Sequence, residues 1–250
     1  MRVNEEEYLN IFLEPVKRCK DYRPKFGKGN KDKGFSIEEF KALYGEDPFY
    51  AWIGLDNDLM YSAHRAAGGM TSIYRQIGVG CERLWRQIII DVTGYTNTDY
   101  ATWSYTTQTS SGKNKKLSLD GRLEIEQIRN REVLFRVDRW IDEYCSNLGE
   151  VAKPSHGIVF EVRQGYKSKD SKRQNADIDN ATVAWANSYL PVFAIFSSQI
   201  DSDIVLRYRN NRCGILIGTM NDNPQISLYS FCDRVLGYDL AGFFRDDLEK

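Results

Sequence analysis

Two short apolar runs in the second half of the chain most strongly limit how it can fold. They are LPVFAIFS at residues 190–197 and CGILIG at residues 213–218. Continuous apolar runs of this kind are typical of strands that are buried inside a sheet. A third strand, GIVFEVR, is predicted around Ile158–Arg163. Because helical patterns separate these three strands, the sequence predicts an α/β layered domain.

The other predicted elements complete this domain. A hairpin is predicted at Trp103–Ile125, with its turn at 110–115, and a possible edge strand at Gln225–Cys232. Helices are predicted at residues 126–148, 171–189 and 201–210. The resulting order is helix, hairpin, helix, strand, helix, strand, helix, strand. It predicts an α/β fold with a mixed central sheet flanked by helices.

The first 70 residues are predicted to form a small helical region, followed by a main domain at residues 71–250. Ser36 and Glu39 form a capping box at the start of a short helix. Another short helix is expected at Asp58–Ala67, ended by the pair Gly68-Gly69. A long helix then runs from residue 71 or 72 to about Val92. Gly78 and Gly80 lie inside it and indicate close packing against a neighbouring segment.

Composition limits the class of protein. A chain of 250 residues with 42% hydrophobic and 28% charged residues is typical of a folded domain. The formal net charge is −1, so a nucleic-acid surface would require local clusters of basic residues. Such clusters occur at residues 23–33, 113–116 and 163–173. Each of them is equally compatible with an ordinary solvated face.

The cysteines and the apolar pattern indicate a cytoplasmic location. The five cysteines are scattered, with no CxxC pair, which favours reduced thiols over a disulfide framework or a zinc site. The start, MRVNEEEYLN, lacks the basic and apolar parts of a signal peptide. No apolar run approaches the length of a membrane span. We therefore expect a cytoplasmic protein without a membrane partner.

Two carboxylates stand out as candidate metal ligands. Asp120 lies on the return strand of the hairpin, and Glu161 lies on the next long strand. If these strands are neighbours, both acids can hold one divalent cation. Mg²⁺ prefers one or two carboxylates together with water and phosphate oxygens. Strand alternation places Arg163 on the same face as Glu161, where its charge could steady a phosphate or an attacking hydroxide.

Each candidate also has a plain structural explanation. Asp120 could be the first residue of an Asp-Gly turn with Gly121. Glu161 could be a half-exposed acid on an edge strand, and Glu82 could be a surface acid on the long helix.

The order of these acidic elements resembles the PD-(D/E)XK nuclease superfamily. Glu82 on a helix, Asp120 on a hairpin strand, and Glu161 with Arg163 on the next strand match its pattern. The resemblance covers about residues 72–218 and is greatest to type II restriction endonucleases, through the segment EVRQGYKSKDSKRQNAD. It implies a restriction-endonuclease-like fold and an Mg²⁺-dependent enzyme that hydrolyses phosphodiester bonds of double-stranded DNA. It also implies attack by water that leaves 5′-phosphate ends.

The sequence departs from this family at two positions. Arg163 stands where the family usually has lysine, and arginine stays protonated, so it cannot act as a general base. Lys167 or Lys169 could supply the missing lysine, or Gln164 could orient the water. Leu119 stands where the family has proline before its aspartate.

Predicted DNA contacts lie in three segments, and the helical region of the first 70 residues could also contact DNA. Polar side chains of the types that bind base edges occur at the start of the predicted helix after Glu161 and around residue 75. Lysines at the hairpin tip suit phosphate contacts. The predicted set is Arg75, Gln76, Lys113, Lys115, Gln164, Lys169, Lys172, Arg173, Gln174 and Asn175.

A homodimer is expected, because palindromic DNA sites match twofold symmetry. The alternatives are a repair or recombination nuclease of the same fold, and a DNA-binding module whose site is catalytically dead. The sequence shows no Gly-rich phosphate loop, nucleophile elbow or histidine pair that would favour a small-molecule enzyme.

Overall fold

The computed structural model describes residues 5–26, 34–108, 112–149, 151–166 and 171–247. The chain divides into two compact units. The larger unit contains Met1–Ile11 and Cys81–Lys250, and the smaller unit contains Phe12–Gly80. Two helices, α1 (Glu5–Lys17) and α4 (Asp58–Thr93), begin in one unit and end in the other. The smaller unit ends at residue 80 of α4, whereas the sequence placed the division after residue 70. The first eleven residues belong to the larger unit.

The smaller unit is helical, as the sequence predicts. Besides parts of α1 and α4, it contains the 3-10 helix η1 (Arg18–Asp21), α2 (Ile37–Gly45) and α3 (Pro48–Trp52). The predicted capping box of α2 is confirmed. The Glu39 amide donates to Ser36 Oγ at 3.2 Å, and the Ser36 amide donates to Glu39 Oε2 at 2.8 Å.

The predicted helix break at Gly68-Gly69 is wrong, because α4 is continuous over 36 residues. Its glycines permit close packing within the smaller unit. A Cβ atom at Gly68 would collide with the hydroxyl of Tyr22, and one at Gly80 would lie 2.5 Å from the carbonyl oxygen of Phe12. The prediction of close packing is thus confirmed at Gly80. It is not confirmed at Gly78, where an added Cβ has no described atom within 4 Å.

This difference gives a matched pair of variants. Gly78→Ala should raise the free energy of unfolding by about 1 kcal/mol, because alanine favours the helix and meets no obstacle. Gly80→Ala should lower it by roughly 1–3 kcal/mol, because the backbone of α1 must move away from the added methyl group. Urea denaturation of both variants measures these changes. Equal stability of the two variants would contradict the packing role of Gly80.

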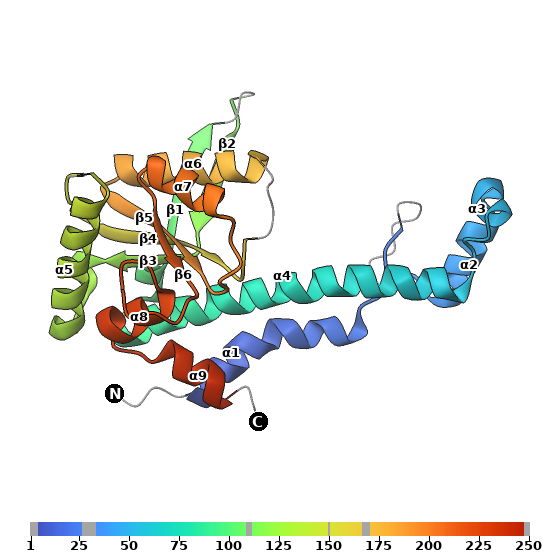
Figure 1. Cartoon of the computed structure of the whole chain (residues 1–250), viewed down its shortest axis with the longest axis horizontal. Coiled ribbons are helices and arrows are strands. Elements are labelled where there is room, and N and C mark those ends of the chain that lie inside the picture. Colours follow the sequence, from blue (N-terminus) through green and yellow to red (C-terminus); the bar gives the residue numbers. More distant parts are fainter. Residues whose placement is uncertain (1–4, 27–33, 109–111, 150, 167–170, 248–250) are drawn as a thin grey trace. The chain divides into compact units, whose positions relative to one another are not determined.

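The larger unit is built on a mixed four-stranded sheet with the order β3-β4-β5-β6 (Figure 1). Strand β3 pairs antiparallel with β4, while β4, β5 and β6 are parallel. The strands are β3 (Gly121–Glu124), β4 (Gly157–Arg163), β5 (Tyr189–Ile195) and β6 (Gly214–Ile217). The three strands predicted from apolar runs, β4 to β6, are therefore confirmed, as is an α/β fold with a mixed sheet flanked by helices.

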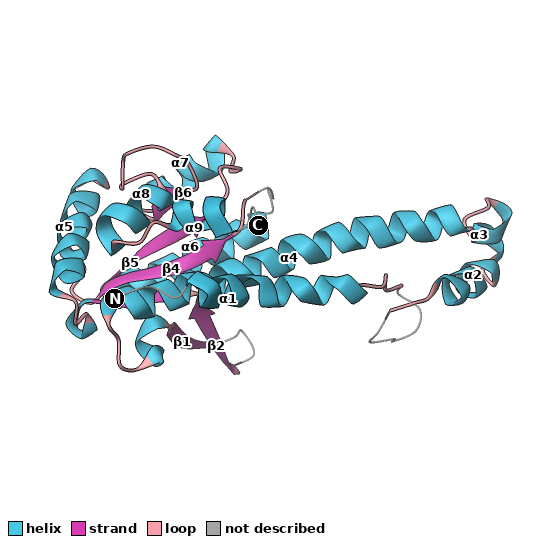
Figure 2. Ribbon diagram, turned by 90° about the horizontal axis from the view of Figure 1, so that it is seen from below, coloured by secondary structure: helices cyan, strands magenta, loops and turns pink. Residues whose placement is uncertain are grey.

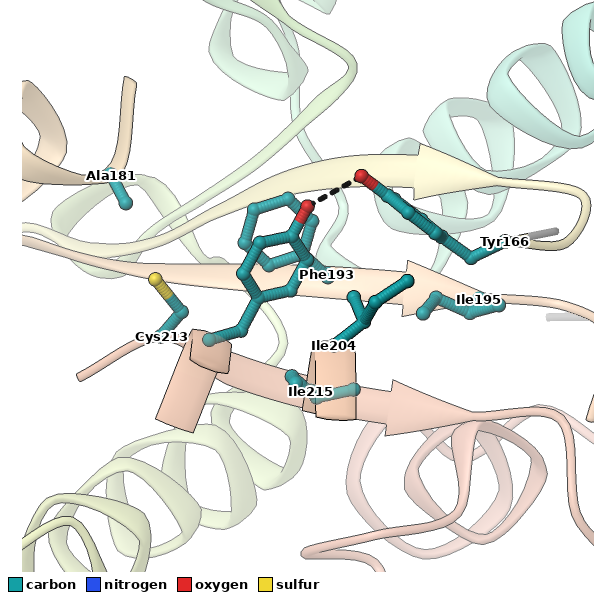
Figure 3. Close-up of a cluster of buried hydrophobic side chains, with 8 residues drawn as sticks. Tyr166, Ala181, Phe193, Ile195, Ile204, Cys213 and Ile215 are labelled. Carbon is teal, nitrogen blue, oxygen red and sulfur yellow. Dashed lines mark hydrogen bonds between the residues drawn. The ribbon is translucent and has the colours of Figure 1, made fainter. Parts of the chain in front are cut away.

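Helices cover both faces of this sheet. Helices α6 (Ser171–Ala186) and α7 (Ser202–Asn210) lie on one face, where they enclose the apolar cluster shown in Figure 3. On the other face, Trp85 of α4 packs edge-on against Phe160 of β4, with 5.1 Å between ring centroids. The remaining elements are η2 (Thr98–Ala101), η3 (Ile125–Gln127), α5 (Arg131–Asn147), α8 (Leu228–Phe231), the π-helix η4 (Cys232–Leu236) and α9 (Leu240–Asp247).

Two predicted strand assignments are wrong. The return strand of the hairpin does not continue to Ile125, because β1 (Trp103–Gln108) and β2 (Asn114–Leu119) form a separate two-stranded sheet (Figure 2). The segment predicted as an edge strand, residues 225–232, makes a single parallel bridge, from Ser227 to Ile217 of β6, and then forms α8. Ser227 also caps this helix by accepting from the Ser230 amide.

Within the part of the chain that the structure describes, no helix combines the length and apolar character needed to cross a membrane.

Candidate functional site

Asp120 lies where the chain leaves the β1–β2 hairpin and enters the main sheet. Its amide donates to the Phe160 carbonyl oxygen at 2.9 Å, and its Oδ2 accepts from the Val162 amide at 2.8 Å. The carboxylate thus satisfies a backbone donor of β4 that β3 does not reach. The chain bends at Asp120 and continues into β3, so the alternative of a tight Asp-Gly turn is wrong.

Glu161 projects from the middle of the sheet, one residue before the amide that Asp120 binds. Its strand, β4, has a partner on each side, so the alternative of an edge strand is wrong. The Glu161 side chain is 15% exposed, and its Oε1 accepts from Arg163 Nη2 at 2.7 Å. Asp120 and Glu161 are therefore close to each other, and Arg163 contacts Glu161. The prediction that Asp120 lies on a strand is wrong, because it lies between β2 and β3.

The C-terminal part of α4 supplies two further charged side chains to this site. Arg86 donates from Nε and Nη2 to the Asp120 carbonyl oxygen, at 3.1 and 2.9 Å. Glu82 lies one helical turn before it, and the charges of Asp120, Arg163 and Arg86 all act on its carboxylate. Glu82 thus faces the site and is not an ordinary surface acid. Arg86 was not among the residues predicted from the sequence.

Burial and mutual repulsion raise the pKa of each carboxylate. Burial, and then the charge of Asp120, raise the pKa of Glu161 to about 8, although Arg163 opposes the change. The same two causes raise the pKa of Glu82 to about 7. Burial raises the pKa of Asp120, while its hydrogen bond from the Val162 amide and the charge of Arg163 lower it. These carboxylates are therefore protonated more easily than in water, and an added positive charge would favour their ionised form.

The carboxylates of Asp120 and Glu161 do not form a full protein cage for a cation. Among the described residues, no group of three or more His, Cys, Asp or Glu side chains is arranged to hold a metal ion. Mg²⁺ needs only one or two carboxylates, because water and phosphate oxygens complete its coordination. Asp120 and Glu161 supply such a pair from neighbouring positions on the sheet.

A fourth carboxylate, Asp177 of α6, completes the charge cluster and was not predicted. It is 4% exposed, and its Oδ1 accepts from Arg163 Nη2 at 2.8 Å. Its Oδ2 accepts from the hydroxyls of Tyr208, at 2.7 Å, and Tyr166, at 3.3 Å. One sequence signal was present: Asp177 shares the buried face of α6 with Ala181 and Ala184. An acid on the apolar face of a helix requires a partner.

The predicted DNA contacts at the start of α6 separate into two kinds. Lys172 and Arg173 are exposed on its first turn. Gln174 is buried, and its Oε1 accepts from Arg207 Nη1 at 2.6 Å. The Asn175 Oδ1 accepts from Arg207 Nη2, also at 2.6 Å. The two amides therefore join α6 to α7 in this structure, and the two cations remain the better candidates for phosphate contacts.

The other predicted contacts are dispersed. Lys113 and Lys115 are exposed on the hairpin. Gln164 directly follows β4, and its carbonyl oxygen accepts from the Ser197 amide at 2.9 Å. Arg75 is exposed and Gln76 half-buried on the part of α4 that belongs to the smaller unit. Lys167 and Lys169 lie outside the described residues.

Comparisons of the chain with protein-family models, with curated proteins and with solved structures give no match.

Proposed function

We propose that this protein is an Mg²⁺-dependent endonuclease of the type II restriction class, which hydrolyses phosphodiester bonds of double-stranded DNA at a short specific site. One observation carries the proposal. The Asp120 carboxylate, just before β3, binds the amide that follows Glu161 on β4, and burial raises the pKa of both carboxylates. A divalent cation and a phosphate are the chemical groups that such a pair, with Arg163 beside it, is suited to bind.

Asp120 and Glu161 are the residues that would hold the cation. The chemistry that Mg²⁺ supplies in such sites is activation of water and stabilisation of the charge that develops on phosphate. The hydrogen bond from the Val162 amide fixes the Asp120 carboxylate, and Arg86 fixes the Asp120 backbone. These contacts preorganise the pair before substrate arrives.

Arg163 and Glu82 have different tasks in this proposal. Arg163 remains protonated, so it binds and polarises the phosphate and does not accept a proton. Glu82 is the carboxylate suited to proton transfer, because its pKa of about 7 lies near the working pH of a general base. Lys167 or Lys169 is retained as the candidate for the missing lysine, and Gln164 as the candidate for orienting the water. In-line attack would leave a 5′-phosphate end.

Binding of DNA is assigned to the exposed cations of the larger unit. Lys172 and Arg173 at the start of α6, and Lys113 and Lys115 on the hairpin, would contact phosphates. A homodimer would place two such sites on the two strands of a palindromic duplex.

A catalytically dead DNA-binding module is the second candidate, and one observation favours it. The Arg163 guanidinium already lies between Glu161 and Asp177, at 2.7 and 2.8 Å. A permanent ion pair there would neutralise Glu161 without a metal ion. This candidate predicts DNA binding that Mg²⁺ does not change, with no cleavage.

Digestion of a plasmid of known sequence with Mg²⁺, followed by run-off sequencing of the ends, tests the proposal. Discrete fragments with 5′-phosphate ends are expected, and EDTA should abolish them. A parallel digest of a branched DNA junction tests the alternative of a repair or recombination nuclease, which would cut the junction and spare the plasmid. Absence of cleavage on both substrates, with retained DNA binding, would support the dead module.

A further inference from the structure

Arg163 has two carboxylate partners, and both use the same nitrogen atom. Its Nη2 lies 2.7 Å from Glu161 Oε1 and 2.8 Å from Asp177 Oδ1. The proposed function requires Glu161 to bind a divalent cation, which would repel the adjacent guanidinium. Arg163 must then release Glu161. The negative charge of Asp177 then attracts the released guanidinium.

Asp177 is held in place independently of Arg163. Its second oxygen, Oδ2, accepts from the hydroxyls of Tyr208 and Tyr166, and these two hydroxyls lie 2.7 Å apart. Tyr208 is fully buried and Tyr166 is 3% exposed, both within the apolar cluster of Figure 3, where a dashed line marks the hydrogen bond made by the Tyr166 hydroxyl. The Asp177 carboxylate is thus held by two buried side chains besides Arg163.

A buried carboxylate that loses its cationic partner is strongly destabilised, so the pair of Arg163 with Asp177 resists separation. Glu161 differs from Asp177 in two ways. Its side chain is 15% exposed, and the proposed cation would replace Arg163 as its positive partner. Breaking the contact to Glu161 therefore costs less than breaking the contact to Asp177.

We propose that Asp177 is a positioning residue that retains Arg163 at the site when Glu161 exchanges Arg163 for a divalent cation. This role depends on the proposed metal-dependent function. Through it, Asp177 would allow a cation to bind Glu161 although residue 163 is an arginine. Arg163 Nε is also buried without a hydrogen-bond partner among the described residues. The retained guanidinium thus has donor capacity left for a phosphate oxygen.

The first test measures the affinity of the unaltered protein and of two variants for Mn²⁺, by calorimetry without DNA. In Asp177→Asn, Arg163 loses the ion pair that draws it away from Glu161, so it should compete with the cation and weaken Mn²⁺ binding about tenfold, or about 1.4 kcal/mol. Tyr208→Phe is the matched control. This variant removes one hydrogen bond to Asp177 but leaves the charge of Asp177 unchanged. The affinity for Mn²⁺ should therefore stay within about twofold of that of the unaltered protein.

The second test is a crystal structure of the unaltered protein with Mn²⁺, located by its anomalous signal. We expect Mn²⁺ at Glu161 and Asp120, with the Arg163 guanidinium still on Asp177. A guanidinium that has left Asp177, or one that still pairs with Glu161 beside the bound ion, would overturn the positioning role. This structure decides the question even if Asp177→Asn does not fold.

The two proposals fail in different ways. If the unaltered protein binds no Mn²⁺, both the metal-dependent function and the positioning role are wrong. If it binds Mn²⁺ and Asp177→Asn binds it equally well, only the positioning role is overturned.

Discussion

Asp120→Asn is expected to abolish Mg²⁺-dependent DNA cleavage while leaving the fold and DNA binding largely intact. The asparagine side chain keeps an oxygen that can accept from the Val162 amide, so the junction between the hairpin and the sheet should survive. It loses the negative charge that the cation requires. Loss of outer-shell partners alone typically costs about 10–100-fold in metal affinity or activity, so removal of a ligand charge should cost more than about 100-fold.

Glu161→Gln should have the same effect on cleavage. This variant also removes the carboxylate partner of Arg163 on β4, but Asp177 still neutralises the guanidinium. The measurement is the initial rate of plasmid cleavage, with DNA binding followed separately by a gel-shift assay in Ca²⁺. Thermal unfolding of each variant shows whether the fold is retained.

Two exposed acids provide the matched controls for these substitutions. Asp142→Asn on α5 breaks a surface ion pair with Lys153, and Glu126→Gln changes an exposed residue of η3. Both should cleave at the rate of the unaltered protein, since exposed ion pairs contribute about 0–1 kcal/mol to stability. If Asp120→Asn and Glu161→Gln cleave DNA as fast as these controls, the site is wrongly assigned.

The apolar strands were predictable because burial on both faces leaves a continuous run in the sequence. That signal located β4, β5 and β6 to within a few residues. The fate of the return strand was not predictable in the same way. Its alternation continues without interruption through Leu119, Gly121 and Leu123. Alternation of apolar and polar residues identifies the buried face of a strand but does not identify its partner strand. Before Asp120 the chain pairs with β1, and after it the chain pairs with β4.

The prediction of α4 was wrong at its glycines because it also depended on an unknown packing partner. A Gly-Gly pair usually weakens a helix, but the preference of one residue is small beside tertiary packing. Gly68 accommodates the Tyr22 hydroxyl, and this close contact cannot be inferred without knowing which segment lies beside the helix. The segment 225–232 was misassigned as a strand because its apolar residues suit either element. The capping serine, Ser227, was the local signal for a helix.

The candidate site was predictable only where chemistry and element order coincide. Asp120, Glu161 and Glu82 were selected because acids on predicted strands and helices follow a recognisable order. Asp177 and Arg86 were missed because their roles depend on contacts between elements far apart in the sequence. Asp177 meets Tyr208 across 31 residues, and Arg86 meets Asp120 across 34.

The metal-free protein should become less stable as the pH rises from about 5 to above 8. The folded-state pKa of Glu161 is raised from 4.5 to about 8, so between these values the folded protein binds a proton that the unfolded chain has lost. A state that binds more protons is weakened as the pH increases. Stability from this group is therefore fully present below 4.5 and is lost as the pH rises through about 8. Glu82 also lowers the stability as the pH rises, between 4.5 and its folded-state pKa of about 7.

Mg²⁺ should reverse this loss, because it binds the ionised carboxylates and not the protonated ones. A ligand that binds only the folded state raises its stability by an amount that grows with affinity, about 2.7 kcal/mol at a hundredfold excess over Kd. The increase caused by Mg²⁺ should thus be small at about pH 6 and largest at about pH 9. Urea denaturation at both pH values, with KCl at matched ionic strength as the control for screening, measures it.

The Glu161→Gln variant separates this effect from any other titrating group. It has no carboxylate at position 161, so the decline in stability with pH should be much smaller and the increase caused by Mg²⁺ should disappear. Asp142→Asn should behave as the unaltered protein does, because its ion pair with Lys153 is at the surface. An increase caused by Mg²⁺ that is equal at both pH values, or that persists in Glu161→Gln, would show that the cation binds elsewhere. Glu161 would then be a protonated structural acid paired with Arg163.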